Sequence, residues 1–447
     1  MLNKISKPFV LFVEKFYPDP LIFATGLTFI AFIMVFIFTD ASPIKAIMCW
    51  GNGFSALMAF IGQLSFTLLS TNALANTRPV SRLLQKISRI PKSEFWCYAL
   101  ACFVTGIASW IAWAFGLVVG GIIAKNVQYA GQKRGLKLHY PLMVAAAYSG
   151  FVIWHMGYSG SIPLFIATKG HAFESIMGIV PVSQTMFAGY NLIGLAICLI
   201  TIPLLMGAMR PKENECVGLT PEIMDRVQQE LNPAEDPPPE TVGERIERWR
   251  WISLVTGLML AIYLTWYFRE KGLDLNLNIV NWTFLVLGLL FANSPIHYVR
   301  LITDAGKTAG QIILQYPFYA GLMGLMTGTG LAKVISVWFI SISTANTLPF
   351  WAFFSGGFLN MFIPSGGGQW AVQAPIFLEA AKVLGVNYSY IANAIAYGDQ
   401  WTNMIQPFWT IPILAIAGLK MRDMMGYTFI TMIWSGIIFA FVLLVLI

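Results

Sequence analysis

The stretch that decides the fold runs from Phe354 to Trp370 and reads FSGGFLNMFIPSGGGQW. Its flanks are apolar, but a proline, a serine and three consecutive glycines interrupt it, and three glycines in a row disfavour an ordinary helix. The first arm, Pro349 to Ile363, would span roughly 22 Å as a helix, which is less than the roughly 30 Å hydrocarbon core of a bilayer. We therefore predict a re-entrant hairpin over 349–381, whose two half-helices meet at an unwound tip. Irregular backbone at that depth must face protein or a water-filled cavity, which makes the tip a candidate binding site.

Composition indicates a polytopic membrane protein. Of its 447 residues, 57% are hydrophobic and 11% are charged, and the mean hydropathy is +0.67, whereas a soluble domain carries about 25% charged residues. The net charge of +7 is best explained by Lys and Arg in cytoplasmic loops, and no basic patch suggests nucleic acid. The five cysteines show neither a metal-binding nor a disulfide pattern, and we expect no cofactor.

The N-terminal segment predicts an interfacial helix. Ile5, Phe9 and Phe16 fall on one apolar stripe with the lysines off it, and prolines end the run at Pro18 and Pro20. Such a helix lies along the membrane surface and is not a cleaved signal. We expect the N-terminus to be cytoplasmic.

A second re-entrant hairpin is predicted over 95–124, with its tip at 109–116. The flanks 78–92 and 125–137 are both strongly basic, so the positive-inside rule places both in the cytoplasm. Two full crossings need about 40 residues, and only about 30 lie between the flanks. The remaining apolar spans are expected at 21–38, 47–75, 141–168, 176–206, 251–268, 277–291, 309–335, 391–419 and 427–447.

The two halves of the chain repeat the same order of elements. Ser42-Pro43-Ile44 matches Ser294-Pro295-Ile296, and Ala147-Tyr148 matches Ala396-Tyr397, at offsets near 250 residues. We predict an N-terminal half (1–208), an acid-rich cytoplasmic linker (209–250) and a C-terminal half (251–447). The unpaired span 251–268 would invert the second half. The fold class is therefore an all-α polytopic membrane protein with an inverted repeat, two re-entrant hairpins and two broken transmembrane helices, which is a plan of secondary transporters.

Asp399 is the one acid expected in the middle of a span, and an intramembrane carboxylate indicates function. Asn393, Gln400, Asn403 and Gln406 fall near the same helical face, and Pro407 then breaks the helix. The amides can hydrogen-bond a carboxylate, ligate Na⁺ or simply hold helices together. We expect Asp399, Asn393 and Ser109 to couple transport to H⁺ or Na⁺, and no other metal is indicated.

The tip of the 349–381 hairpin predicts an anion site. Ser365, the N–H groups of Gly366 to Gly368 and Gln369 would form a nest at the positive end of a helix. No Lys or Arg stands nearby in the sequence, which favours a monocarboxylate, and Trp370, Trp401 and Phe408 are candidates to line a pocket for a short acyl chain. The expected substrate-binding residues are Ser365, Gly366, Gly367, Gly368, Gln369, Trp370, Trp113, Gly116, Trp154, His155, Gln400, Asn403 and Gln406.

Two other classes of function share parts of this pattern. Gly157-Tyr158-Ser159-Gly160 has the form of an intramembrane serine protease motif, although such an enzyme needs a histidine on another helix, and His297 falls in a loop. Re-entrant loops also occur in channels, but the mid-span acid and the polar stripe favour coupled transport. We do not expect an enzyme.

Several motifs together resemble a known family. They are Pro18-Asp19-Pro20-Leu21-Ile22-Phe23-Ala24, Trp113-Ala114-Phe115-Gly116-Leu117-Val118-Val119-Gly120, Pro364-Ser365-Gly366-Gly367-Gly368, Ala396-Tyr397-Gly398-Asp399-Gln400-Trp401 and Gln406-Pro407-Phe408-Trp409. The chain resembles the bacterial short-chain fatty acid transporters over nearly its whole length, with Asp399 where some relatives are expected to carry Glu.

The resemblance implies a function and an assembly. It implies a plasma-membrane carrier for butyrate, acetoacetate and similar monocarboxylates, within an ion-transporter superfamily that includes elevator-type dicarboxylate carriers. A homodimer is expected, in which one domain is a scaffold and the hairpins move. The alternative in the same class is a carrier for dicarboxylates or other small anions.

Overall fold

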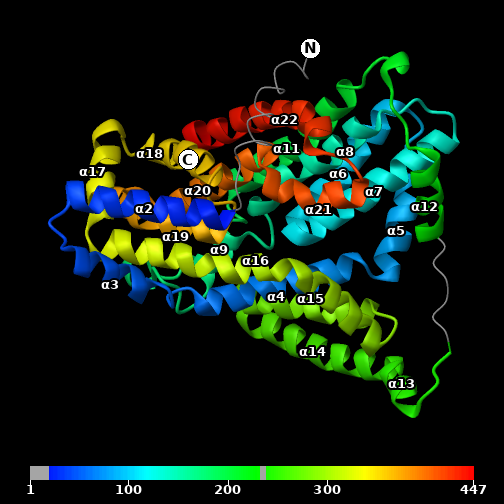
Figure 1. Cartoon of the computed structure of the whole chain (residues 1–447), viewed down its shortest axis with the longest axis horizontal. Helices are drawn as coiled ribbons and strands as arrows, with labels where there is room; N and C mark the ends of the chain where they lie inside the picture. Colours follow the sequence, from blue (N-terminus) through cyan, green and yellow to red (C-terminus); the bar gives the residue numbers. More distant parts are fainter. Residues whose placement is uncertain (1–19, 232–237) are drawn as a thin grey trace.

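The computed structural model describes residues 20–231 and 238–447, and these residues form helices without any strand (Figure 1). The predicted interfacial helix near Ile5 to Phe16 lies outside the described residues. In chain order the α-helices are α2 (Pro20–Phe38), α3 (Pro43–Gly53), α4 (Met58–Ala75), α5 (Arg78–Ser88), α6 (Glu94–Ile111), α7 (Trp113–Lys133), α8 (Tyr140–Ser149), α9 (Ser161–Ala167), α10 (Glu174–Met177), α11 (Gly189–Ala208), α12 (Pro221–Leu231), α13 (Val242–Glu247), α14 (Arg250–Lys271), α15 (Leu277–Phe291), α16 (Pro295–Gly328), α17 (Leu331–Ile342), α18 (Leu348–Asn360), α19 (Gly366–Leu384), α20 (Tyr388–Thr402), α21 (Pro407–Ala417) and α22 (Met421–Phe441). Short 3₁₀ turns are η1 (Gly150–Met156), η2 (Val182–Gln184), η3 (Glu213–Glu215) and η4 (Asn403–Ile405), and α22 continues as the π-helical turn η5 (Val442–Leu446).

Helix lengths and apolarity agree with a membrane protein. Within the described residues, five helices are long and apolar enough to cross a bilayer, or six when the bent pair α16–α17 is counted as one span. Large apolar side chains on α2 and α14, such as Phe29 and Ile262, are mostly exposed on the surface of the fold. This outward apolar surface is what lipid contact requires, because lipid tails replace water around it.

Several predicted boundaries are confirmed, and three are wrong. Helices α2, α14 and α15 match the predicted spans. In the predicted linker, Thr220 caps helix α12 by accepting a hydrogen bond from the Ile223 N–H. The span predicted at 47–75 is two helices, and at the end of the first one Gly53 packs so tightly on α16 that a Cβ there would lie 2.5 Å from the Ala320 carbonyl oxygen. The broken backbone follows this close approach, which only glycine permits.

The other two differences concern helix starts. The span predicted from Ile176 begins only at Gly189, because Gly178 ends α10 with a positive φ of 67° and an irregular segment follows. The span predicted at 309–335 covers the later part of α16 and the start of α17, and α16 itself begins at Pro295 and is capped by Ser294. Its chain then turns by 76° into α17. Polar residues in the first turns of α16 hid this start from an apolar-span prediction.

Both predicted hairpins appear as helix–break–helix pairs whose arms pack together, α6 with α7 and α18 with α19. The first break is the single residue Ala112, which is extended at φ −158° and ψ 134°. The second break covers Met361 to Ser365. Whether each pair enters and leaves the membrane on one side stays a prediction, as does the inverted orientation of the two halves.

The three glycines of the second pair are helical, so the prediction of an unwound glycine tip is wrong. Gly366 to Gly368 form the first turn of α19, and Ser365 caps it by accepting a hydrogen bond from the Gly368 N–H. A Cβ on these glycines would lie 2.2–2.5 Å from the rings of His155, Phe60 and Tyr319, respectively. The glycines are therefore needed for close packing around a helix start, where a serine cap offsets their low helix propensity.

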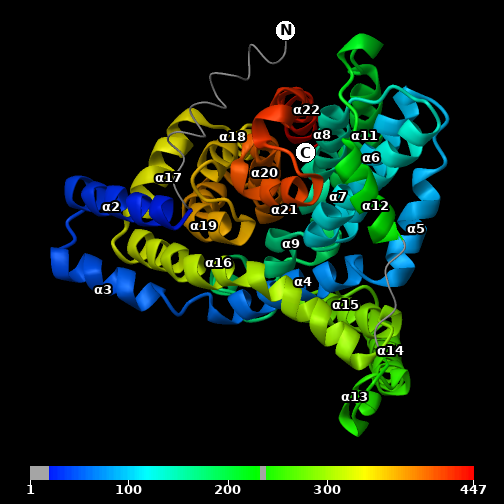
Figure 2. The ribbon, with the colours of Figure 1, turned by 45° about the vertical axis from the view of Figure 1, so that its right-hand side comes forward.

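Two helices are broken in their middle, as predicted. The first runs α8, η1 and α9 with a break at Gly157–Gly160, and the second runs α20, η4 and α21 with a break before Pro407. Each follows its two-arm pair in the chain, so the order of elements agrees in both halves. In both views the broken helices lie in the middle of the molecule, while α2, α3 and α14 lie at its edges (Figures 1 and 2).

Candidate functional site

A small cavity lies where several half-helices begin. Helices α7, α19 and α21 start there with Trp113, Gly366 and Phe408 in its wall, and its volume of about 20 Å³ suits a water-sized group. Helix N-termini carry partial positive charge. The full lining is Leu64, Trp113, Trp154, Ser161, Gln315, Tyr316, Pro364, Ser365, Gly366, Phe408 and Trp409, with no charged side chain. The electrostatics of this polar cavity favour an anion without presenting a fixed cation.

A second, apolar cavity adjoins the polar one. It has a volume of about 120 Å³ and shares Trp113, Phe408 and Trp409 with the polar cavity. The rest of its lining is mainly aliphatic, from α4, α7 and α21: Leu68, Asn72, Ala114, Leu117, Val118, Ile411 and Pro412. The Trp113 and Trp409 rings meet edge to face at 5.3 Å between the two spaces. Together the two cavities offer a polar end and an apolar end.

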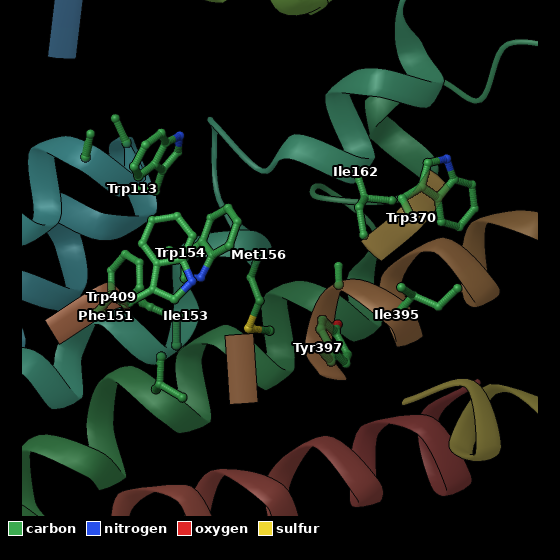
Figure 3. Packing of buried hydrophobic residues seen from close by; sticks show 14 of the residues in the cluster. Trp113, Phe151, Ile153, Trp154, Met156, Ile162, Trp370, Ile395, Tyr397 and Trp409 are labelled. Carbon is green, nitrogen blue, oxygen red and sulfur yellow. The ribbon is translucent and has the colours of Figure 1, made fainter. Parts of the chain in front are cut away.

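An aromatic cluster forms one wall of the site (Figure 3). Trp154 stacks on the His155 ring, with centroids 4.0 Å apart, and lies 6.0 Å from Trp409. Of the three aromatic residues predicted to line an acyl pocket, only Phe408 is in the cavity walls. Trp370 packs on Phe173, well away from Trp154 (Figure 3), and the Trp401 indole donates to the Met432 carbonyl oxygen.

His155 and Asp399 form a buried pair that joins the two broken helices. His155 Nδ1 lies 3.0 Å from Asp399 Oδ2, and both side chains are fully buried. The Ile162 N–H donates to His155 Nε2 at 3.1 Å. Because a backbone N–H can only donate, Nε2 carries no proton, and Nδ1–H must be the donor to Asp399. Asp399 Oδ1 has no hydrogen-bond partner among the described residues. A proton or a cation that neutralises the carboxylate would therefore bind at Oδ1.

Two amides predicted in the site also connect the broken helices. The Gln400 side-chain oxygen accepts from the His155 N–H at 2.9 Å, and the Asn403 side-chain oxygen accepts from the Trp154 indole at 2.9 Å. The backbone N–H and the indole N–H can only donate, so the amide atom that each one contacts must be the oxygen. Within the described structure the NH₂ groups of Gln400 and Asn403 have no acceptor.

Three other amides near Asp399 have the reverse arrangement. Asn360 Nδ2 donates to the Asp399 carbonyl oxygen at 2.8 Å, and Gln406 Nε2 donates to the Asn360 carbonyl oxygen at 2.5 Å. Gln369 Nε2 donates to the Gly356 carbonyl oxygen at 2.7 Å. The side-chain oxygens of these three residues are buried without a partner in the described part of the chain.

The remaining predicted residues lie apart from the Asp399 pair. Asn393 Nδ2 donates to Tyr190 Oη and to the Thr185 carbonyl oxygen, so Asn393 is not brought to Asp399. Gly116 packs on Ser109, where a Cβ would lie 2.1 Å from the serine oxygen. Within the described residues, no group of three or more His, Cys, Asp and Glu side chains is arranged to hold a metal.

Sequence reasoning missed four residues of this site. Ser161 contacts His155 Nε2 at 3.0 Å, Tyr316 hydrogen-bonds Ser365, Trp409 lines both cavities, and Asn360 contacts Asp399. Asn360 and Ser161 could have been found, because each is polar and next to a predicted break. Tyr316 lies inside a long apolar helix, and its role depends only on packing.

Comparison with known proteins gives one consistent family. The model of the short-chain fatty acid transporter family matches residues 1–446. A provisionally named short-chain fatty acid transporter of Escherichia coli (strain K12) is 38% identical over 440 residues, covering 98% of each chain. A protein of the same name from Haemophilus influenzae is 37% identical over 453 residues, again covering 98% of each chain.

Two solved transporters have a similar fold. Neisseria gonorrhoeae MtrF, described as illuminating a class of antimetabolite efflux pumps, superposes with a TM-score of 0.60 at 18% identity and covers 97% of each chain. The Alcanivorax borkumensis YdaH transporter gives a TM-score of 0.56 at 13% identity, covering 95% of this chain and 98% of its own. At these identities the likeness concerns the fold alone.

Proposed function

Because the chain belongs to the short-chain fatty acid transporter family, we propose that it carries butyrate, acetoacetate and similar monocarboxylates across the bacterial plasma membrane. The transport is secondary active and coupled to H⁺ or Na⁺. The pair of adjoining cavities supports this proposal best. A carboxylate oxygen suits the water-sized polar cavity at the half-helix N-termini, and a short acyl chain suits the apolar cavity beside it.

Hydrogen-bond donors around the cavities support the carboxylate end. The buried indole N–H groups of Trp113 and Trp409 have no acceptor among the described residues. Leaving a buried donor unpaired costs about 1–3 kcal/mol, so a ligand that accepts these hydrogen bonds recovers that energy. The backbone N–H groups in the first turn of α19, whose Gly366 lines the cavity, add further donors at the polar end.

Monocarboxylates fit better than dicarboxylates. The lining of both cavities holds no Lys or Arg, and a second carboxylate would be placed against aliphatic and aromatic side chains. Burying an unpaired charge in such surroundings is costly. A carrier for dicarboxylates or other small anions is the second candidate within the same class, and competition experiments separate the two.

The coupling group in this proposal is Asp399. It is the one fully buried acid in the described part of the chain, and its free oxygen Oδ1 is a place for a cation to bind. A cation there offsets the negative charge that would otherwise repel an incoming carboxylate at close range. The proposal also includes a cytoplasmic N-terminus, two inverted halves around the 209–250 linker and a homodimeric assembly.

The protease alternative finds a partial match that fails on geometry. Ser161 Oγ, His155 and Asp399 follow the order of a catalytic triad, with 3.0 Å between each pair of bonded atoms. In a protease, however, the lone pair of His Nε2 takes the serine proton. Here the Ile162 N–H occupies that lone pair. The serine of the protease-like motif, Ser159, accepts a hydrogen bond from the Trp113 N–H and so anchors the start of α7.

Uptake by proteoliposomes tests the proposal. Purified protein in vesicles should accumulate labelled butyrate against its gradient when a cation gradient is imposed, and acetoacetate should compete. Succinate should compete poorly. If neither monocarboxylate moves or competes, the substrate assignment is wrong, and if uptake never exceeds equilibration under any gradient, a channel explains the data better.

A further inference from the structure

We propose that the coupling ion is Na⁺ and that it binds between the C-terminal ends of α18 and α20, held by the side-chain oxygens of Asn360, Asp399 and Gln406. Gln369, on the adjoining start of α19, is placed to complete the site. This inference rests on the proposed function, since it names the ion for the same coupled transport.

The orientation of three buried amides is fixed by their hydrogen bonds. Asn360, Gln369 and Gln406 each donate from the NH₂ end to a backbone carbonyl oxygen. A carbonyl oxygen can only accept, so none of the three amides can be flipped. Each therefore presents an oxygen, and all three oxygens are buried without a donor in the described structure. Asp399 Oδ1 is a fourth such oxygen.

The hydrogen bonds place the three amide residues and Asp399 in one neighbourhood. Asn360 is bonded to the backbone of Asp399, and Gln406 is bonded to the backbone of Asn360. Gln369 reaches Gly356, one helical turn before Asn360, and Gly356 packs against Gly398. Four acceptors without donors in one buried place are mutually repulsive unless a positive species lies among them.

The backbone adds negative partial charge at the same place. Helix α18 ends at Asn360 and α20 ends at Thr402, so two negative helix ends meet here. Half-helix C-termini and unwound carbonyl groups are the usual cation-binding elements of transporters built from broken helices. The positive N-terminus of α19 lines the anion cavity through Ser365 and Gly366.

Ligand number favours Na⁺ over H⁺. A proton on Asp399 Oδ1 would supply one hydrogen bond and leave the other amide oxygens unpaired. A hard cation takes several oxygen ligands at once, and carboxylate and amide oxygens are the ligands it prefers. Buried unpaired acceptors are costly, so the state that engages the most oxygens is the stable one.

The bound ion also explains the coupling. Gly366 lines the anion cavity and lies against His155, which is bonded to Asp399. An ionised Asp399 is therefore one side chain away from an incoming carboxylate, and like charges at short range in a low dielectric repel strongly. Na⁺ at Asp399 removes that repulsion, so substrate binds after or with the ion.

The experiment compares two glutamines in the full-length protein. Gln406→Met keeps the size of the side chain and removes its oxygen, and the Na⁺ concentration for half-maximal butyrate uptake should rise about tenfold or more. Gln128→Met is the matched control, because Gln128 is equally buried, has an unpartnered oxygen and donates to the Leu138 carbonyl oxygen. It lies about 22 Å along α7 from Trp113, and its Na⁺ dependence should match the wild type.

Two further measurements make the inference refutable. An inward Na⁺ gradient without ΔpH should drive butyrate accumulation; if ΔpH drives it equally well without Na⁺, the ion is H⁺ and the Na⁺ site is wrong while the carrier function stands. In detergent, NaCl should raise the unfolding temperature more than KCl at equal ionic strength, and Gln406→Met should remove that difference. Absence of the difference in the wild type contradicts the site even if the substrate has been misassigned and no uptake is seen.

Discussion

Two sets of amides around the buried pair at Asp399, a donor side and an acceptor side, use the same residue types in opposite ways. Gln400 and Asn403 offer NH₂ groups, because their oxygens accept hydrogen bonds from the first half of the chain. Asn360 and Gln406 offer oxygens, because their NH₂ groups donate to carbonyl oxygens of the second half. One side thus has free donors and the other free acceptors. A carboxylate is complementary to the first side and a cation to the second.

The contrast shows how a protein separates an anion site from a cation site without fixed charges on both. Only Asp399 is both acidic and fully buried among the described residues, and amide orientation and helix ends supply the rest of the field. Loss of the cation side should disturb ion dependence first, and loss of the donor side should disturb substrate affinity first.

Replacing Asp399 should have the largest effect. Asp399→Asn keeps an acceptor for His155 but removes the charge and puts an NH₂ group where a cation ligand is expected. Gradient-driven accumulation of butyrate should fall to the level of empty vesicles, as measured by uptake under imposed cation gradients. The control is Glu379→Gln on α19, which should retain accumulation. If Asp399→Asn accumulates butyrate normally, the cation side is not built around this residue.

Gly366 lies between the anion cavity and the His155–Asp399 pair, and a side chain at this position should impair both. In Gly366→Ala the new Cβ would lie 2.3 Å from the His155 ring, and relieving such overpacking typically costs about 1–3 kcal/mol. We expect a lower unfolding temperature in detergent and a large loss of uptake. Gly62→Ala in α4, where a Cβ meets nothing within 4 Å, should be neutral or slightly stabilising. Equal behaviour of the two variants would show that His155 moves freely and does not connect the sides.

Removing the indole N–H of Trp409, which lines both cavities, tests the anion site alone. Trp409→Phe keeps an aromatic ring between the cavities and removes the indole N–H. A hydrogen bond to a charged group is worth about 1.5–3 kcal/mol, so butyrate affinity should fall about tenfold or more while the half-maximal Na⁺ concentration stays the same. Trp50→Phe on α3 removes another buried N–H without a partner in the described structure and should leave affinity unchanged. A shift in Na⁺ dependence with Trp409→Phe would mean that the two sides are not separate.

Much of this architecture is predictable because it depends on local signals. Runs of apolar residues define the spans, and Pro364 and Pro407 mark the breaks through their missing N–H groups. The central role of Asp399 follows from the cost of a charge in a membrane. The prediction failed at Gly366 to Gly368, because helix propensity is a weak prior and close packing with a serine cap overrides it.

The division into donor and acceptor sides was beyond sequence reasoning. Gln400, Asn403 and Gln406 lie within seven residues of each other and look equivalent on a helical face. Which end of each amide is free depends on whether its partner is an N–H of the first half or a carbonyl oxygen of the second. Those partners lie up to about 250 residues away in the chain, so no local pattern contains them.

The smallest effect is expected in the first two-arm pair, at Ser109. Its hydroxyl oxygen is buried without a partner in the described residues, and the sequence predicts it as an ion-coupling group. In the structure it packs on Gly116, and no hydrogen bond joins it to the Asn360, Asp399 and Gln406 oxygens. Ser109→Ala should therefore change the half-maximal Na⁺ concentration by less than about twofold, since we do not expect an oxygen without a hydrogen bond to that site to be one of its ligands. Thr105→Val in the same helix, which loses a hydroxyl bonded to the Ala101 carbonyl oxygen, is the control for hydroxyl loss. A tenfold shift confined to Ser109→Ala would reveal a second cation site in the first half and would make the two halves more alike than the amide orientations indicate.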